Sequence, residues 1–419
     1  MQLNNSKFFL VSLLMLLFLP SFLKVALNAS SMALGVIFCF SIIFPYYIVF
    51  LHRLDIFYVK KLLYISILFS FLYIHFLLSI LLGLDFEFKN LTTLFLILFL
   101  FLTSIFYSNL FLYVNEQQLL KYIYRLLLFI IFLGILSFLF RLNSLGYSIY
   151  SKSIFPYSEP SHYVTTLGFL FVFCFLIAKK SLLPIVILIY LLVFSLFKPS
   201  SLGLIYLSFI LFFLTVRLRF WYSLVVILIF FVMILFIFSI ESTNLNYFIS
   251  RMTFSSDSTN STALVFLQGW EDSWNTIINH PFGLGLQNAK LVESGDIGLR
   301  IYEITGRFVN KDGAFLASKL IVEFGLLGLS LVIIYIFFFF RSLLTLIKYS
   351  KHKTYFDLNF DSCIKVVFSN SIIVTFFVEM FVRGYGYFSP NVFLLLFAMI
   401  STFSKSNNFS IGCINYARK

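Results

Sequence analysis

Charged residues are scarce in this sequence. Only 11% of its 419 residues are charged, whereas 61% are hydrophobic. Soluble globular proteins average about 25% charged and about 45–50% apolar residues. This shortage of charge excludes a soluble globular protein, a disordered chain and a nucleic-acid-binding protein, because no water-soluble core could bury so many apolar side chains. The chain is therefore expected to lie in a bilayer, with membrane lipids around it.

Cysteine is scarce as well. The four cysteines, Cys39, Cys174, Cys363 and Cys413, lie in apolar segments or in the C-terminal tail and show no zinc-type spacing. That pattern excludes a disulfide framework and a metal–thiolate cluster. The hydrophilic segments also lack an HExxH motif and a cluster of Cys and His residues. No metal and no cofactor is therefore expected from the sequence.

Long apolar runs fill most of the chain. A helix needs about 20 apolar residues to cross a hydrocarbon core of about 30 Å. The runs predict an all-α integral membrane protein with about twelve transmembrane helices, at residues 8–23, 31–51, 62–83, 91–113, 122–140, 161–178, 181–197, 200–216, 220–240, 313–340, 364–383 and 388–404. The predicted parts are the N-terminal spans (1–240), one large hydrophilic loop (241–312), and the C-terminal spans with a tail (313–419).

The placement of Lys and Arg predicts the orientation of these spans. If the N-terminus is inside, the inner loops and both termini hold seventeen basic residues, and the short outer loops hold six. Cytoplasmic loops of membrane proteins carry such an excess of Lys and Arg. Both termini are therefore expected in the cytoplasm and residues 241–312 on the outside. The net charge of +13 then reflects topology and requires no anionic partner.

Polar residues open the sixth predicted span at its outer end. Ser158 or Glu159 could cap a helix that has Pro160 in its first turn. Capping does not explain why Glu159 and His162 stand three residues apart, on one helix face beside the membrane boundary. Ionisable groups at that depth are costly and tend to be functional. Glu159 and His162 are therefore candidate functional residues.

The large loop carries Arg251 and, after it, an amphipathic helix. Its apolar residues recur with helical spacing from Ala263 to Ile278, and Glu271 lies on the polar face. Such a helix is expected to lie along the outer bilayer surface or to cover a cavity. Trp270 is interpreted as an interfacial anchor or, alternatively, as a platform on which a sugar stacks.

Further charged residues follow the loop. Arg307, Lys311 and Asp312 precede the tenth predicted span, and Lys319 and Glu323 follow at a spacing that permits a salt bridge. Glu379 and Arg383 share a face before the last outer turn. They could pair with each other, or Glu379 could hold Arg383 so that its guanidinium faces an anionic ligand.

Taken in order, these segments resemble the bacterial O-antigen polymerases (Wzy-type), part of the wider O-antigen polymerase/ligase group. The general resemblance covers most of the chain: many Phe-, Leu- and Ile-rich spans, cytoplasmic termini, and one large outer loop before the last spans. The specific resemblance lies in five short segments, 158–162 (SEPSH), 264–271 (LVFLQGWE), 283–285 (GLG), 311–319 (KDGAFLASK) and 383–388 (RGYGYF).

The resemblance implies a glycosyltransferase of the bacterial inner membrane. Such enzymes take a glycan from undecaprenyl pyrophosphate and transfer it to another lipid-linked repeat unit at the periplasmic face. The family's scheme uses no metal and no cofactor. A chain-length regulator protein is then a candidate partner.

This reaction requires preorganised positive charge where the pyrophosphate departs. Arg251 and Arg383 are the favoured cations, and Glu159 or His162 is the candidate base for the attacking hydroxyl. The remaining candidates for substrate binding are Trp270, Glu271, Arg307, Lys311, Asp312 and Glu379.

The sequence departs from the family at one point and leaves alternatives open. Many relatives, particularly ligases, have a second arginine shortly after the first one in the large loop, but residues 263–269 contain none. The pairing of arginines is therefore open. An O-antigen ligase, which differs in its acceptor, is the main alternative. A flippase fits less well, because flippases have short loops and charges within a central cavity.

Overall fold

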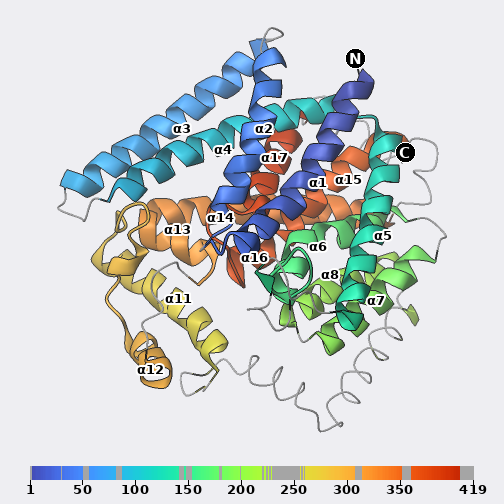
Figure 1. The fold of residues 1–419 in the computed structure, drawn as a ribbon. Coiled ribbons are helices and arrows are strands. Elements are labelled where there is room, and N and C mark those ends of the chain that lie inside the picture. The colour runs from blue at the N-terminus through green and yellow to red at the C-terminus, as the bar shows by residue number, and fades with distance from the viewer. Residues whose placement is uncertain are drawn as a thin grey trace.

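Helices form along the apolar runs of the chain (Figure 1). This computed structural model describes residues 2–29, 31–50, 56–81, 87–140, 146–147, 153–178, 182–198, 200–218, 221–222, 225, 228, 255, 258, 260–306, 314–351 and 360–405. The N-terminal helices are α1 (Gln2–Ala26), α2 (Ala33–Phe50), α3 (Ile56–Leu81), α4 (Phe88–Leu112), α5 (Glu116–Leu139), α6 (Pro160–Ile177), α7 (Leu183–Phe197) and α8 (Ser201–Arg217).

The C-terminal half is also helical. Its helices are α11 (Ser261–Asn279), the 3-10 helix η3 (Ala289–Leu291), α12 (Asp296–Thr305), α13 (Leu316–Phe324), α14 (Leu326–Lys351), α15 (Phe360–Thr375), α16 (Phe377–Phe381) and α17 (Pro390–Lys405). Within the described residues there is no β-strand, only an isolated bridge between Ile154 and Tyr157. The prediction of an all-α protein is confirmed.

Six of the helices are long and apolar enough to cross a membrane: α1, α4, α5, α6, α14 and the stretch Cys363–Phe381. Shorter apolar helices lie at five further predicted spans, 31–51, 62–83, 181–197, 200–216 and 388–404. The ninth predicted span, 220–240, lies almost wholly outside the described residues. The structure therefore supports a membrane-embedded protein, and the number of twelve spans stays a prediction.

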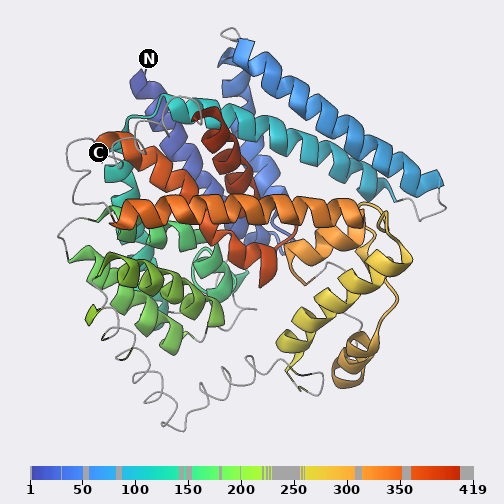
Figure 2. The same cartoon turned by 180° about the vertical axis from the view of Figure 1, so that it is seen from behind.

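Helix α6 is the centre of the bundle. All of its residues are buried, and it packs against α5, α7, α8 and α15 (Figure 2). A helix that is apolar on every side belongs in a protein core or in a membrane, and α6 lies in the core of this bundle. The largest core cluster accordingly extends from α1 through α6 to α17. This packing fixes the start of α6, where the first candidate residues predicted from the sequence, Glu159 and His162, lie.

The tenth predicted span, 313–340, differs in the structure. The chain breaks at Gly325, so that α13 and α14 are separate helices, and α14 continues to Lys351. Gly325 has φ +59°, which an L-residue rarely adopts, and a Cβ there would lie 2.1 Å from the carbonyl oxygen of Pro281. Lys319 and Glu323 therefore lie on a short helix of their own, not along one continuous span.

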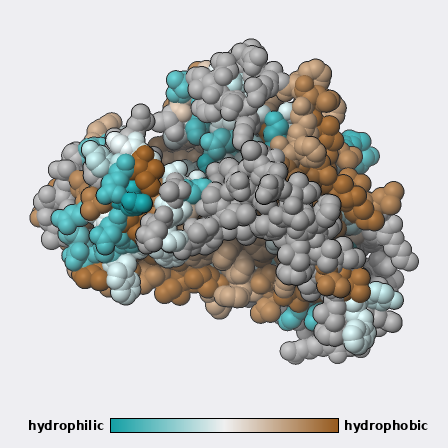
Figure 3. Space-filling view, turned by 90° about the horizontal axis from the view of Figure 1, so that it is seen from below, coloured by the Kyte–Doolittle hydropathy of each residue, from teal (hydrophilic) through white to brown (hydrophobic). Residues whose placement is uncertain are grey.

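Helices α11 and α12 lie at the edge of the bundle, where hydrophilic side chains gather on the surface (Figure 3). Helix α11 packs against α12 and α13 through a face that includes Ala263, Leu264 and Gly269. On its other side Trp274 and Ile278 are exposed. The predicted amphipathic helix is thus present. Its packed face includes polar residues such as Gln268 and Asp272, whereas part of its apolar face, at Trp274 and Ile278, is exposed.

Candidate functional site

The start of α6 is held in place by hydrogen bonds to α1 and to the preceding loop. The Tyr157 hydroxyl donates to the carbonyl of Leu17 at 2.9 Å, and the Tyr147 hydroxyl donates to the carbonyl of Pro156 at 2.6 Å. Glu159 is the N-cap residue with an extended backbone, and Pro160 occupies the first turn, as the sequence predicts. The Glu159 side chain makes no capping bond, so that its carboxylate is available for other partners.

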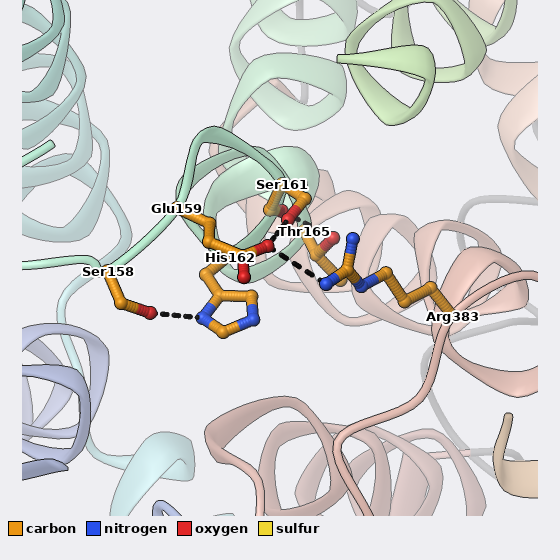
Figure 4. Close-up of polar contacts among 6 residues, drawn as sticks. All are labelled: Ser158, Glu159, Ser161, His162, Thr165 and Arg383. Atoms are coloured by element: carbon orange, nitrogen blue, oxygen red, sulfur yellow. Dashed lines mark hydrogen bonds and ion pairs between the residues drawn. The ribbon is translucent and has the colours of Figure 1, made fainter. Parts of the chain in front are cut away.

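That carboxylate pairs with Arg383 (Figure 4). The Arg383 guanidinium donates to Oε2 of Glu159 at 2.9 Å, and the Ser161 hydroxyl donates to the same oxygen at 3.0 Å. The two residues are 224 positions apart in the chain. The side chain of Glu159 is 44% exposed and that of Arg383 is 31% exposed, so a ligand could contact both. The structure therefore brings together two of the four residues predicted to be catalytic.

Arg383 does not pair with Glu379, which was one of the two interpretations of that spacing. Glu379 is buried, and the Ser389 hydroxyl donates to its Oε1. The chain turns after α16, and this turn carries Arg383 away from the Glu379 side of the helix toward the start of α6. Glu379 thus supports the turn through Ser389 and does not hold the guanidinium.

The charge of Arg383 controls the ionisation of Glu159. Partial burial raises the pKa of the Glu159 carboxyl, but the neighbouring Arg383 and the hydrogen bond from Ser161 outweigh burial, so the pKa lies below its ordinary value. Glu159 is therefore ionised at neutral pH. A carboxylate with this counter-charge is a weak base while the pair is intact.

His162 lies beside this pair but is enclosed. Only 5% of the residue is exposed, and its Nδ1 is 2.9 Å from the hydroxyl of Ser158. The ring also meets the edge of the Tyr385 ring, with centroids 4.6 Å apart. His162 thus joins the start of α6 to the 383–388 turn. Of the two candidate bases, Glu159 is the one that a substrate can reach.

Lys24 is a third charged residue of the site, and the sequence analysis did not select it. It lies in the last turn of α1 and interacts electrostatically with both Glu159 and Arg383. Tyr157 fixes this end of α1 against the start of α6 through its bond to Leu17. The position of Lys24 at the outer end of the first predicted span could have marked it as a candidate. In the count of Lys and Arg it is only one of six outer charges.

Trp270 and Glu271 have identifiable structural partners. The ring of Trp270 packs against Phe315 with centroids 4.9 Å apart, and the residue keeps 40% exposure. Glu271 accepts hydrogen bonds from the backbone N–H of Ile297, at 3.3 and 3.2 Å, in the first turn of α12. A Cβ on Gly384 would lie 3.1 Å from the Cα of Phe315, so the packed pair of Trp270 and Phe315 adjoins the turn that carries Arg383.

Glu323 and Lys319 form a buried pair below the same turn. Their charged atoms are 3.7 Å apart, and the Tyr387 hydroxyl donates to Glu323 at 2.8 Å. The GLG segment packs on the end of α13: the N–H groups of Leu284 and Gly285 donate to the carbonyls of Val322 and Glu323, each at 3.0 Å. The N–H of Gly283 donates to the carbonyl of His280 at 2.7 Å, so all three GLG amides are used within the fold.

Four predicted residues, Arg251, Arg307, Lys311 and Asp312, lie outside the described residues. In the part of the chain that the structure describes, no three His, Cys, Asp or Glu residues are grouped as metal ligands would be. What remains at the site is one accessible carboxylate, Glu159, paired with Arg383, and the charge of Lys24, which interacts electrostatically with both. This excess of positive charge suits the binding of an anion.

Comparisons with known proteins identify no relative for this arrangement. No protein-family model, no curated protein and no solved structure matches the chain.

Proposed function

We propose that the protein is an O-antigen (surface polysaccharide) polymerase. It would transfer a glycan from undecaprenyl pyrophosphate to another lipid-linked repeat unit, at the periplasmic face of the bacterial inner membrane. The observation that supports this most is the accessible Arg383, held by Glu159 from a distant segment, with Lys24 close to both. The sequence resemblance suggests the substrate class, and the excess of positive charge at the site supports the binding of its diphosphate.

In this proposal, Arg383 and Lys24 bind the diphosphate of the donor. The bond between the anomeric carbon and the diphosphate oxygen breaks as the acceptor hydroxyl forms the new glycosidic bond. Negative charge accumulates on the departing diphosphate, and preorganised cations stabilise it. Guanidinium suits this task because its planar N–H groups match phosphate oxygens in pairs.

Glu159 is the proposed acceptor of the hydroxyl proton. Its pKa is low because Arg383 is beside it. When Arg383 contacts the diphosphate, two further negative charges surround the guanidinium and weaken its effect on Glu159. The carboxylate then becomes more basic at the moment the acceptor hydroxyl must lose its proton.

The gel profile of the surface polysaccharide from a deletion strain tests this function. A strain that lacks a polymerase still attaches single repeat units to lipid A-core, so we expect one short band and no ladder. A strain that lacks the ligase attaches none, and that result would favour the ligase. Restoration of the ladder by a plasmid-borne copy is the control, and an unchanged ladder in the deletion strain would refute both.

The proposal also includes metal-independent transfer. Purified protein treated with EDTA should polymerise lipid-linked repeat units at its untreated rate, because Lys24 and Arg383 provide the positive charge. Strict dependence on added divalent metal would contradict this part of the proposal.

A further inference from the structure

An apolar cavity of about 310 Å³ lies between α3, α4, α13, α14 and α17. Its walls include Leu72, Leu100, Leu320, Ile334 and Met380. Two of its wall residues, Leu331 and Ile334, are 38% and 48% exposed, so the cavity opens to the surface of the helices. An apolar chain from outside can therefore enter it.

The walls of the cavity offer a ligand no free polar group. Its two tyrosines use their hydroxyls elsewhere: Tyr335 donates to the carbonyl of Ile373 at 3.0 Å, and Tyr387 donates to Glu323 at 2.8 Å. A sugar or a peptide in this cavity would leave its own polar groups without hydrogen bonds. A hydrocarbon chain would not. The lining thus selects for a lipid chain.

The cavity adjoins the turn that carries Arg383. Met380 precedes Arg383 by three residues, Tyr387 follows it by four, and both line the cavity. A Cβ on Gly384 would lie 2.7 Å from the backbone nitrogen of Leu316, another wall residue, so this turn packs directly on the wall. A lipid chain in the cavity could therefore have its polar end at this turn.

Helix α3 provides a thin outer wall. Leu72 faces the cavity, whereas Ile67, Phe71 and Ile74 are exposed on the surface of the same helix. The main packing partner of α3 is α4, and His75 Nε2 lies 2.8 Å from the carbonyl oxygen of Phe282. On this side one helix separates the cavity from the surroundings, which in a membrane are lipid chains, and at Ile334 on α14 the cavity is open to them.

We propose that this cavity binds the isoprenoid chain of the lipid-linked diphosphate. This inference rests on the proposed function and extends it: Arg383 and Lys24 bind the head group, and the cavity binds the chain of the same molecule. The donor is thereby held at both ends of its diphosphate–lipid linkage, and the length of the chain contributes to its recognition.

A pair of adjacent residues on α14 provides the test. Ile334 lines the cavity and Ile333 does not, although both are about half exposed, at 48% and 56%. Ile334→Trp should fill the cavity, and Ile333→Trp is the matched control. Each purified variant is given donors with the same glycan on either undecaprenyl or geranyl diphosphate. Binding of undecaprenyl diphosphate without sugar is followed by native mass spectrometry.

We expect the wild-type protein and Ile333→Trp to prefer the undecaprenyl donor about tenfold or more in KM, because the longer chain buries more apolar surface. Ile334→Trp should lose that preference and bind undecaprenyl diphosphate more weakly. A thermal unfolding midpoint equal to that of Ile333→Trp shows that the variant is folded. Leu72→Trp should act in the same way from the opposite wall.

The contrary results are distinct. Equal use of both donors by the wild type, or an unchanged preference in both cavity variants, would overturn the chain site and leave the proposed function intact. A phospholipid that undecaprenyl diphosphate cannot displace would assign the cavity to a bilayer lipid and also overturn the inference. No transfer from either donor would overturn the proposed function, and the inference with it.

Discussion

The pair of Glu159 and Arg383 shows how one residue depends on a distant partner. Glu159 has the sequence context of a helix cap, yet its side chain makes no cap and turns to a guanidinium from the other end of the chain. The pair is partly exposed, and exposed ion pairs contribute little to stability. We therefore expect the pair to act in ligand binding, so that substitutions of either residue affect activity more than folding.

Arg383→Ala should abolish long glycan chains while the protein still accumulates in the membrane. Arg383→Lys keeps the charge but loses paired N–H donors, so we expect partial activity, about 10²-fold below wild type. Glycan profiles on gels and immunoblots of membranes measure both effects. Arg300→Ala is the control, since Arg300 forms a comparable exposed pair with Glu303, at 3.1 Å, outside the site. Wild-type chain length in Arg383→Ala would remove Arg383 from the site.

The buried carboxyl of Asp272 leads us to predict that the stability of the protein depends on pH. Asp272 lies on α11 with 8% exposure, and its Oδ1 has no hydrogen-bond partner among the described residues. Burial, and then the neighbouring Glu271, raise the pKa of Asp272 from 3.8 to about 7. In the unfolded chain the carboxyl loses its proton near pH 4, so the folded protein loses stability as the pH rises from there to about 7. The loss is at most about 4 kcal/mol.

Asp272→Asn should therefore remove this dependence. Unfolding midpoints of the detergent-solubilised wild type should be lower at pH 8 than at pH 5, and those of Asp272→Asn should differ less between the two. Glu293→Gln, at an exposed position, should behave as the wild type. An equal pH response in all three proteins would contradict the assigned pKa.

At the scale of the element, the break between α13 and α14 decides where several site residues lie. A Cβ on Gly328 would lie 1.9 Å from the carbonyl oxygen of Leu320, so α14 starts in direct contact with α13. The N–H of Leu326 also donates to the carbonyl of Pro281 at 2.8 Å, which connects the break to the residues just before the GLG segment. Helix α13 can then support both the GLG segment and Tyr387.

A comparison of two glycines with positive φ, Gly325 at the break and Gly306 elsewhere, distinguishes the cost of backbone strain from the cost of close packing. Gly325→Ala should destabilise the protein by more than about 3 kcal/mol, because a Cβ would meet backbone atoms of Pro281 and Gly283. Gly306 has φ +66° and no atom within 4 Å of a Cβ, so Gly306→Ala should cost only about 1 kcal/mol. Thermal unfolding of the two variants measures the difference. Equal losses would show that packing at Gly325 contributes nothing.

At the scale of the whole molecule, the proposed function depends on orientation. The Lys and Arg distribution predicts that α11 and α12 face the periplasm. Alkaline phosphatase fused after Gly295 should therefore be active, whereas a fluorescent protein fused after Ser350 should fluoresce in the cytoplasm. Phosphatase activity at the second position but not at the first would reverse the topology and place Arg383 away from a periplasmic donor.

Much of the fold could be predicted from the sequence. Helices lie at the predicted apolar spans that the structure describes, since the length of an apolar run is a local property. The start of α6 at Pro160 and the amphipathic helix α11 were also predictable from local spacing. The break at Gly325 was not, because one glycine inside an apolar run does not show which backbone will approach it.

The sequence by itself determined the all-α fold, the apolar helices and the residue types of the site. Only the tertiary structure decided the partners: Arg383 meets Glu159 instead of Glu379, Lys24 joins them, and His162 is enclosed. The physical reason is distance along the chain. Helical spacing predicts contacts between residues three or four apart, whereas the contact across 224 positions depends on how whole helices pack.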